Sequence, residues 1–322
     1  MDTQYLLYIT AKFLIIVGKG LLIYSSTIFL LAIPAVIQEY KIWKHTQTPL
    51  SLWGIIKVYL FNIIWMVLSL TGAVLLFPIW ASRGFGSSVQ LEAHCVMERL
   101  TAIALTSFMI GSVEIHGEHK LPWTQFGKDI ASTGTNSEVA PIYIANHGSQ
   151  IDVGVIYFAI HRFKWIAKKS VQYIPGPGTL MSLSGHVFIQ RSGKNSKSVS
   201  NLYEQSYRAI RQGIPLFLFP QGTRRITERL PFKDGAFNMA LETQARIVPI
   251  SIEVPMGTWN HLFPISQLWG EKGDTIIVTV HDTIQVTKDM NKEDLKQKCM
   301  DTIYSTLPSS YGGTKCEKIK TY

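Results

Sequence analysis

The chain has 322 residues, and its 31 Lys and Arg against 22 Asp and Glu give a formal net charge of +9. The length allows one large domain or two small ones, and the charge suits phosphate-bearing partners, either nucleic acid or an anionic lipid surface. The mean hydropathy is positive, at +0.15, and zinc-finger, KH and RRM motifs are absent from the sequence. The composition therefore favours membrane lipids over nucleic acid as partners. Cys95, Cys299 and Cys316 are far apart and offer neither a disulfide framework nor metal-ligand spacing.

Two long apolar segments occupy the first 80 residues. Residues 21–37 and 58–80 carry no charged side chain. As a helix, the second segment is about 35 Å long, enough to cross a hydrocarbon core of about 30 Å. We expect a membrane-embedded helical region over residues 1–85, either as a hairpin that spans the bilayer or as a helical pair lodged in one leaflet. Lys and Arg flank both segments, so charge does not assign an orientation.

Residues 86–113 are expected to form a connecting amphipathic helix. Its sequence from Leu91 to Val113 is polar early and apolar later. The apolar part is short for a membrane span, so two placements remain open. The helix packs on the next domain, or it rests on the bilayer surface.

Residues 114–322 alternate between short β-rich apolar runs and helical stretches. This alternation predicts an α/β domain with a mostly buried mixed sheet flanked by helices. A Pro/Gly cluster at 176–180 is expected to be a connecting turn. The expected strands lie within 139–146, 162–168, 185–191, 214–220, 246–254 and 275–286, and the expected helices within 149–161, 196–212 and 236–245.

A histidine and an aspartate stand five residues apart in YIANHGSQID, at the end of the first expected strand. With His147 in the turn and Asp152 in the first helical turn, the carboxylate can reach back to the imidazole. A carboxylate on one ring nitrogen makes the other a general base. Gly148 permits the bend, and Ser149 is a fair N-cap residue. The backbone N–H groups at the helix start could stabilise an oxyanion. A buried histidine satisfied by its neighbours is the alternative interpretation.

Cations follow two other expected strands. In FPQGTRR, Gly222 and Arg224 come after a strand, and in GHVFIQRSGK a strand ends at Arg191. A glycine turn lets backbone amides approach an anion, and an arginine grips phosphate oxygens in a bidentate fork. Ligands bind at the carboxyl ends of strands in α/β sheets, so these groups are expected near His147. Taken singly, each arginine is equally well a solvated surface charge.

The four blocks NHGSQID, GHVFIQR, FPQGTR and IVPISI, in this order, resemble the motif blocks of the glycerolipid acyltransferases, the family of 1-acylglycerol-3-phosphate acyltransferases. The resemblance covers roughly residues 95–260. It implies transfer of a fatty acyl chain from acyl-CoA to the sn-2 hydroxyl of lysophosphatidic acid, which forms phosphatidic acid. Glycerol-3-phosphate or another lysophospholipid are alternative acceptors. The resemblance implies no metal or other cofactor, because acyl-CoA is a co-substrate with an activated thioester.

The resemblance also implies roles for individual residues. His147 would be the general base, and Asp152 would hold it and stabilise its charge. The expected phosphate-binding residues are Arg191, Gly222, Thr223 and Arg224; the other motif positions are Asn146 and Gln221, with Val248, Pro249 and Ile250 lining the acyl or acceptor site.

Two positions depart from the family pattern. The third block usually reads FPEGTR, but Gln221 replaces the glutamate, and in the second block Gln190 stands where aspartate often precedes the arginine. An amide keeps an acceptor oxygen and gains donors, but it loses the negative charge. If the family carboxylate only orders the loop, activity survives. If it takes part in the chemistry, the chain is an inactive lipid-binding scaffold.

Basic residues near the C-terminus bear on location. Lys318 and Lys320 in KIKTY resemble the dilysine retrieval signal of endoplasmic-reticulum membrane proteins, although a short basic tail also matches by chance. We expect an endoplasmic-reticulum membrane protein whose catalytic domain and C-terminus face the cytosol.

The sequence from His161 to Lys169 interleaves aromatic and basic residues. This pattern fits two interpretations equally well: a surface that contacts anionic lipid headgroups, and a strand with one face in solvent.

Overall fold

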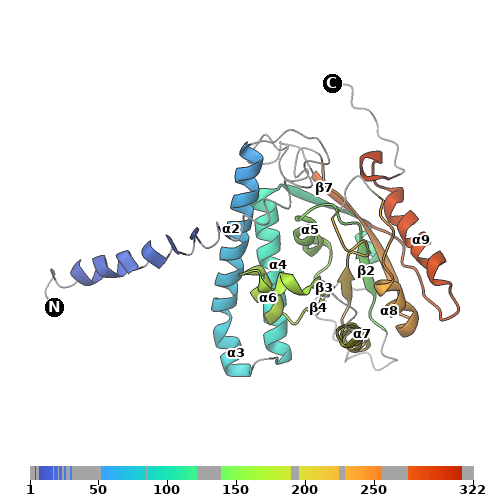
Figure 1. The fold of residues 1–322 in the computed structure, drawn as a ribbon, viewed down its shortest axis with the longest axis horizontal. Helices are drawn as coiled ribbons and strands as arrows, with labels where there is room; N and C mark the ends of the chain where they lie inside the picture. The colour runs from blue at the N-terminus through green and yellow to red at the C-terminus, as the bar shows by residue number, and fades with distance from the viewer. Residues whose placement is uncertain are drawn as a thin grey trace, which may run out of the picture.

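The computed structural model describes residues 52–84, 86–121, 139–189, 196–224, 229–255 and 275–313, together with most of residues 4–26 and residue 30. Within these residues, a seven-stranded sheet lies between two layers of helices (Figure 1). The strands are β1 Ser112–His116, β2 Ile142–Ala145, β3 Lys164–Lys168, β4 Val187–Ile189, β5 Leu216–Leu218, β6 Ile247–Glu253 and β7 Thr275–Val280.

The strand order is β1-β7-β6-β2-β5-β3-β4. Neighbouring strands pair in parallel except β6 and β7, which are antiparallel. The predicted mixed sheet flanked by helices is therefore confirmed. The helices are α2 Leu52–Leu75, α3 Phe77–Arg83, α4 Ser88–Met109, α5 Asp152–Ala159, α6 Pro177–Leu183, α7 Ser196–Arg211, α8 Gly235–Thr243 and α9 Lys292–Ser305.

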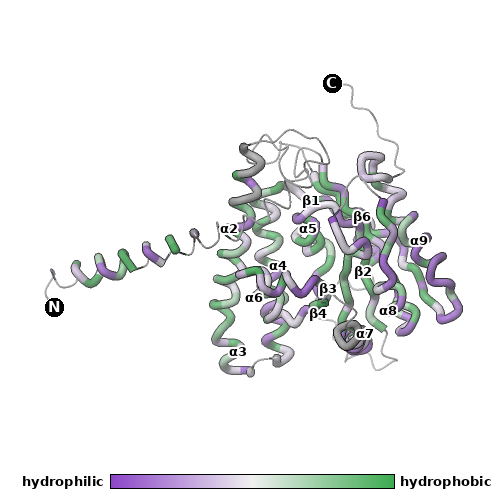
Figure 2. The backbone as a smooth tube through the Cα atoms, in the orientation of Figure 1, coloured by the Kyte–Doolittle hydropathy of each residue, from purple (hydrophilic) through white to green (hydrophobic). Residues whose placement is uncertain are grey.

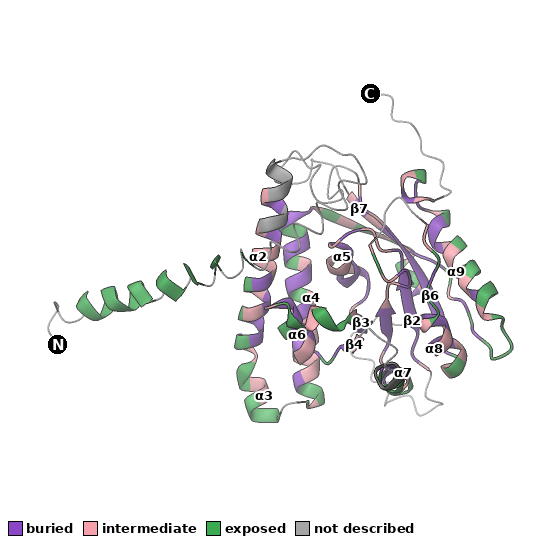
Figure 3. Cartoon of the chain, in the orientation of Figure 1, coloured by how far each residue is buried: buried purple, intermediate pink, exposed green. Residues whose placement is uncertain are grey.

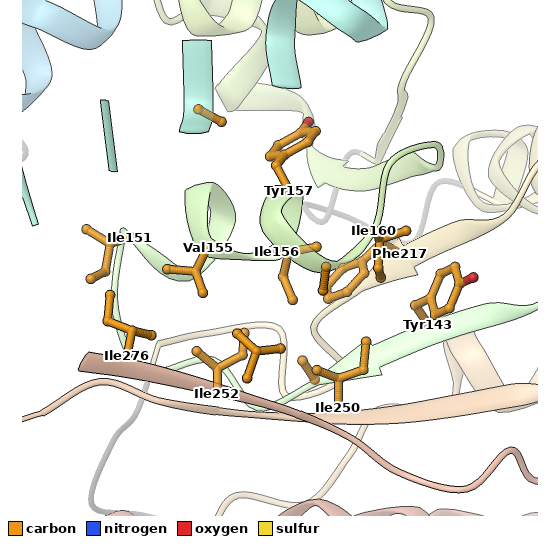
Figure 4. Close-up of a cluster of buried hydrophobic side chains, with 14 of the residues drawn as sticks. Tyr143, Ile151, Val155, Ile156, Tyr157, Ile160, Phe217, Ile250, Ile252 and Ile276 are labelled. Carbon is orange, nitrogen blue, oxygen red and sulfur yellow. The ribbon is translucent and has the colours of Figure 1, made fainter. Parts of the chain in front are cut away.

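Each face of the sheet buries its own hydrophobic core. On β2, Tyr143 faces the core beneath α4 and α5, whereas Ile142 and Ile144 face the core beneath α7, α8 and α9. Figure 4 shows Val155 and Ile156 of α5 packed over the strands. All four residues of β2 are buried, as expected for a strand covered on both faces. The strands are buried throughout the middle of the sheet, while the outer side of α9 is exposed (Figure 3).

The apolar helices stand at one side of the sheet. By length and composition, the stretch Leu60–Arg83 is long and apolar enough to cross a membrane, and it is coloured largely green in Figure 2. Pro78 falls in the first turn of α3, where its missing N–H costs no hydrogen bond. Helix α2 packs against α4 and α6. Most of the other expected apolar segment, residues 21–37, lies outside the described residues, as do Lys318 and Lys320.

Several expected boundaries are corrected. The connecting helix ends at Met109 rather than near Val113, because Gly111 has a φ of 133° and residues 112–116 form β1. The Pro/Gly cluster begins α6 instead of forming only a turn. The last strand ends at Val280, and Ile284 makes a single bridge to Ile247. Helix α4 packs on α5, so this helix covers the sheet domain, one of the two placements left open.

Candidate active site

Strand register brings His147 beside Gln221. Ile144 on β2 pairs with Leu218 on β5, and His147 and Gln221 each come three residues after this pair. The Oε1 atom of Gln221 accepts a hydrogen bond of 2.9 Å from the backbone N–H of His147. Two of the four motif blocks therefore meet at the carboxyl ends of adjacent parallel strands, where α/β sheets place their ligands.

The side chain of Asp152 holds the turn that carries the histidine. Its Oδ2 lies 3.0 Å from Nδ1 of His147 and accepts hydrogen bonds from the backbone N–H groups of Gly148, at 2.7 Å, and Ser149, at 2.9 Å. Its Oδ1 accepts a fourth bond, of 2.7 Å, from the Ser149 hydroxyl. Four donors suit an acceptor-only carboxylate. With Nδ1–H directed at Asp152, the lone pair of the imidazole resides on Nε2, which can accept a proton.

These contacts correct two details of the expected turn. The N-cap residue of α5 is Ile151, and Ser149 donates its hydroxyl to Asp152 instead of capping the helix. The amides of Gly148 and Ser149, which are those beside the imidazole, are bonded to the carboxylate. They are therefore committed to shaping the turn, and the expected oxyanion role does not belong to them.

An aromatic stack fixes the plane of the imidazole. The ring of His147 lies parallel to that of Phe219, with 4.0 Å between centroids and an interplanar angle of 10°. Phe219 stacks in turn on Trp165 of β3, at 5.6 Å. The His147 side chain is 16% exposed and the Asp152 side chain 2%. The imidazole is thus held on one edge and one face, while part of the ring remains exposed.

Gln221 connects the histidine turn to helix α9. Its side-chain N–H₂ donates a hydrogen bond of 2.8 Å to the hydroxyl of Tyr304. Burial raises the pKa of Tyr304 to about 12, so the hydroxyl stays protonated. The guanidinium of Arg229 lies over the same ring, 5.1 Å from its centroid. Both ends of the Gln221 amide are therefore used in positioning. Reasoning from the sequence missed Tyr304, because helix α9 was not predicted.

The remaining motif residues lie directly after β2 and within β6. The side-chain amide of Asn146 exchanges two hydrogen bonds of 2.8 Å with the backbone of Ile252, which ties the end of β2 to β6. Val248 and Ile250 were expected to line the acyl or acceptor site, but both are fully buried in the core. Pro249 pairs with β2 in the strand register and is also buried. These three residues therefore belong to the buried strand β6 and not to the lining of an open pocket.

The expected phosphate loop is partly described. Gly222 has a φ of 70° and closes a turn with a 3.0 Å hydrogen bond from its N–H to the carbonyl of Phe219. Thr223 is exposed and Arg224 is partly exposed, directly after this turn. Arg191 and Gln190 lie outside the described residues. Strand β4, which precedes them, is three strand spacings from β2, roughly 14 Å.

The histidine turn also contacts the apolar helix α2. The side-chain amide of Gln150 donates a 2.8 Å hydrogen bond to Asn62. Beside this contact, a narrow cavity of about 20 Å³ runs between α2, α4, α5 and α6, with Phe61, Trp65 and Val153 in its lining. The turn that carries His147 is therefore tied, through Gln150, to the apolar helix α2.

A buried polar cluster joins α4 to the sheet. Nε2 of His186 lies 2.6 Å from a carboxylate oxygen of Glu98, and Nδ1 of the same ring accepts a hydrogen bond from the backbone of Trp165. The indole N–H of Trp165 donates to the hydroxyl of Tyr157 on α5, at 2.8 Å. The cluster reaches the turn that carries His147 through the Trp165–Phe219 stack. In the described part of the chain, no group of three or more His, Cys, Asp or Glu side chains is arranged to hold a metal ion.

Known proteins resemble the chain in sequence and in fold. An acyltransferase family model matches residues 112–253. A 1-acyl-sn-glycerol-3-phosphate acyltransferase from Haemophilus influenzae is 31% identical over 189 residues, which cover 57% of this chain and 71% of that protein. One of the same description from Chlamydomonas reinhardtii is 30% identical over 177 residues, 55% of this chain and 51% of the relative.

A third relative, the 1-acyl-sn-glycerol-3-phosphate acyltransferase of Cocos nucifera, is 36% identical over 137 residues, 42% of this chain and 44% of the relative. The match thus spans about half the length of the Chlamydomonas and Cocos proteins. The crystal structure of the 1-acyl-sn-glycerophosphate (LPA) acyltransferase PlsC from Thermotoga maritima shares the fold. Its TM-score is 0.51 at 18% identity, over 75% of this chain and 92% of that one. These matches confirm the resemblance carried by the four motif blocks, and the chain belongs to the acyltransferase family that includes the 1-acyl-sn-glycerol-3-phosphate acyltransferases.

Proposed function

We propose that the chain is an acyl-CoA-dependent acyltransferase that converts lysophosphatidic acid to phosphatidic acid. The observation that carries the proposal is the contact between Nδ1 of His147 and Oδ2 of Asp152, at 3.0 Å. It supplies a general base whose tautomer and orientation are fixed. The names of the relatives support the same acceptor.

The reaction follows from the open nitrogen of the imidazole. Nε2 of His147 takes the proton of the sn-2 hydroxyl while that oxygen attacks the thioester carbonyl carbon of acyl-CoA. The new C–O bond forms and the C–S bond breaks. The CoA thiolate then takes the proton from the imidazolium, which restores the neutral imidazole. Asp152 stabilises the imidazolium while it exists. A base of this kind contributes about 10²- to 10⁴-fold to the rate.

The protein recognises its acceptor through the phosphate group of that lipid. Arg224 and the turn at Gly222 follow Gln221, which is bonded to the backbone of the base. The family carboxylate is replaced by a neutral amide, so one negative charge is missing beside the expected phosphate position. Lower negative charge favours a dianionic phosphate over a zwitterionic headgroup. This supports lysophosphatidic acid over lysophosphatidylcholine, with glycerol-3-phosphate as the nearest alternative.

The contact between the catalytic turn and α2 supports catalysis at a membrane surface. Gln150 bonds Asn62, and the stretch Leu60–Arg83 is long and apolar enough to enter a bilayer. Both substrates are lipids with acyl chains, so a base beside such a helix meets them where they partition. We place the protein at the endoplasmic-reticulum membrane with the catalytic domain in the cytosol, on the dilysine-like Lys318 and Lys320.

An inactive lipid-binding scaffold is the second candidate, and Gln221 is the observation behind it. The hydrogen bonds of Gln221 go to the backbone of His147 and to Tyr304, which are positioning contacts. A residue with only that task can be an amide without loss of the chemistry. The geometry therefore favours the enzyme.

An acceptor panel tests the proposed function. The purified protein in detergent is given labelled oleoyl-CoA with lysophosphatidic acid, glycerol-3-phosphate or lysophosphatidylcholine in separate reactions. We expect phosphatidic acid as the main product and the highest kcat/KM for lysophosphatidic acid. A higher kcat/KM for another acceptor would reassign the substrate, and background-level transfer to all three would favour the scaffold.

A further inference from the structure

We propose that Lys233 binds the acceptor's phosphate, as a second cation on the loop that carries Gly222 and Arg224. This inference rests on the proposed function, because it names a residue that would recognise the same acceptor. Lys233 lies outside the four motif blocks, between the FPQGTR block and helix α8. Its place was not predicted from the sequence.

The backbone of Lys233 is tied to the phosphate loop. Its N–H donates a 2.9 Å hydrogen bond to the carbonyl of Pro220. Pro220 stands inside the turn that the Gly222 N–H closes on Phe219. Residue 233 is therefore held beside residues 219–222 despite the eleven or more positions that separate them in sequence.

The lysine side chain crosses over Gly222. A β-carbon added at position 222 would lie 2.7 Å from Nζ, 3.0 Å from Cε and 3.2 Å from Cδ of Lys233. Gly222 also has a φ of 70°, which side-chain-bearing residues rarely adopt. The glycine thus gives the turn its shape and leaves room for the ammonium group above it. Because the aliphatic part of the Lys233 side chain lies against the turn at Gly222, its positive charge is held beside this turn.

The charge of Lys233 is available to an anion. Among the residues that the structure describes, no carboxylate lies within ion-pair distance of its Nζ. The adjacent carboxylate, Asp234, is paired with Lys292 at 2.9 Å and with Lys296 at 2.8 Å. An anion at Gly222 therefore meets an ammonium group that the adjacent Asp234 does not neutralise.

The position also fits the length of the acceptor. Gly222 directly follows Gln221, with about 3.8 Å between their Cα atoms, and Gln221 bonds the backbone of His147. In lysophosphatidic acid, the short glycerol backbone joins the hydroxyl that reacts to the phosphate. A base and a phosphate-binding ammonium group, on two loops joined by the hydrogen bond between His147 and Gln221, match these two ends of the acceptor.

Kinetics and direct binding test the proposal with Lys233→Met, which keeps the stem and removes the charge. Lys288→Met, another exposed lysine, is the matched control. For Lys233→Met we expect KM and Kd for lysophosphatidic acid to rise about 10- to 100-fold, the loss of one charge-assisted hydrogen bond. The KM for acyl-CoA and the affinity for phosphate-free monoacylglycerol should not change, and Lys233→Arg should retain most of the affinity.

An unchanged affinity for lysophosphatidic acid in Lys233→Met would overturn the proposal. So would a rise in the KM for acyl-CoA alone, because the ammonium would then serve the phosphates of CoA. Binding is measured without acyl-CoA, so it decides the matter even if the wild type transfers no acyl group and the proposed function fails. In that case, wild-type binding that Lys233→Met weakens would still support the assignment, and equal or absent binding would refute it.

Discussion

The side-chain oxygen of Gln221 accepts a hydrogen bond from the backbone N–H of His147, while its side-chain nitrogen donates to Tyr304. The backbone amide is always a donor, so the orientation of the Gln221 amide is determined. The residue that departs from the family pattern therefore connects the turn that carries His147 to helix α9. This explains how a neutral side chain can stand at this position without removing a reacting group.

Replacement of Gln221 by glutamate should leave an active enzyme. One carboxylate oxygen can accept from His147 N–H, and the other can accept from the Tyr304 hydroxyl. We expect kcat/KM for lysophosphatidic acid to stay within about 10-fold of the wild type. Gln221→Leu is the control, since it leaves two buried groups without partners and should lower the free energy of unfolding by about 1–3 kcal/mol per group. A well-folded but inactive Gln221→Glu protein would show that the amide itself is needed.

Asp152→Asn should separate charge from geometry. An amide oxygen can take the place of Oδ2, with its three N–H donors, and the amide nitrogen can donate to the hydroxyl of Ser149. The turn should therefore survive, whereas the imidazolium loses its stabilising charge. We expect kcat to fall by about 10²- to 10⁴-fold with a near-native unfolding midpoint. Wild-type turnover by this variant would mean that Asp152 is only a structural residue.

The Glu98–His186 contact should contribute to stability more than its exposed counterpart on the same helix. Glu98→Ala removes the carboxylate 2.6 Å from a buried imidazole N–H and leaves that donor unsatisfied. We expect denaturant unfolding to show a loss of about 3 kcal/mol. Glu92→Ala, which breaks an exposed pair with Arg162, should cost less than about 1 kcal/mol. Equal losses for the two variants would show that burial of the cluster is energetically unimportant.

Stability should fall on acidification through His281. Burial first, and the charge of Lys120 next, lower the pKa of His281 to about 4. Its ring nitrogen Nε2 lies 2.7 Å from Ser251, whose hydroxyl also bonds Ile303 of α9. Because the folded pKa lies below the usual value of about 6.5, the stabilisation is complete above pH 6.5 and is lost as the pH falls toward 4.

The measurement is the free energy of unfolding between pH 7.5 and pH 4, for the wild type and for His281→Gln. We expect the wild type to lose more stability over this range than the variant, which has no group to protonate at this position. Parallel curves would remove His281 as a cause of acid sensitivity.

Much of the fold could be predicted because apolar runs and turns alternate clearly after residue 114. The strand carrying Ile142 to Ala145 is buried on both faces, and such a strand appears in sequence as a continuous apolar run. Strand β1 was missed because its residues alternate between exposed and half-buried, and its sequence follows an apolar helix directly. Helix α9 was missed because its charged outer side dominates the sequence, although Asn291 caps its first turn in the expected way.

The site was predictable where it is local in sequence. His147 and Asp152 are five residues apart, so one turn and one helix start bring them together. Tyr304 and Lys233 reach the site only through the packing of α9 and the path of the chain before α8. No spacing rule gives contacts of that kind, because they depend on the tertiary arrangement of the elements.

The most direct measurement of the central claim is the rate of phosphatidic acid formation by His147→Gln, with oleoyl-CoA and lysophosphatidic acid as substrates. His119→Gln, which changes an exposed histidine in a short 3₁₀ turn, is the matched control. We predict that His147→Gln loses at least about 10²-fold in kcat, while His119→Gln retains the wild-type rate. A folded His147→Gln protein that forms phosphatidic acid at the wild-type rate would contradict the assignment of His147 as the general base.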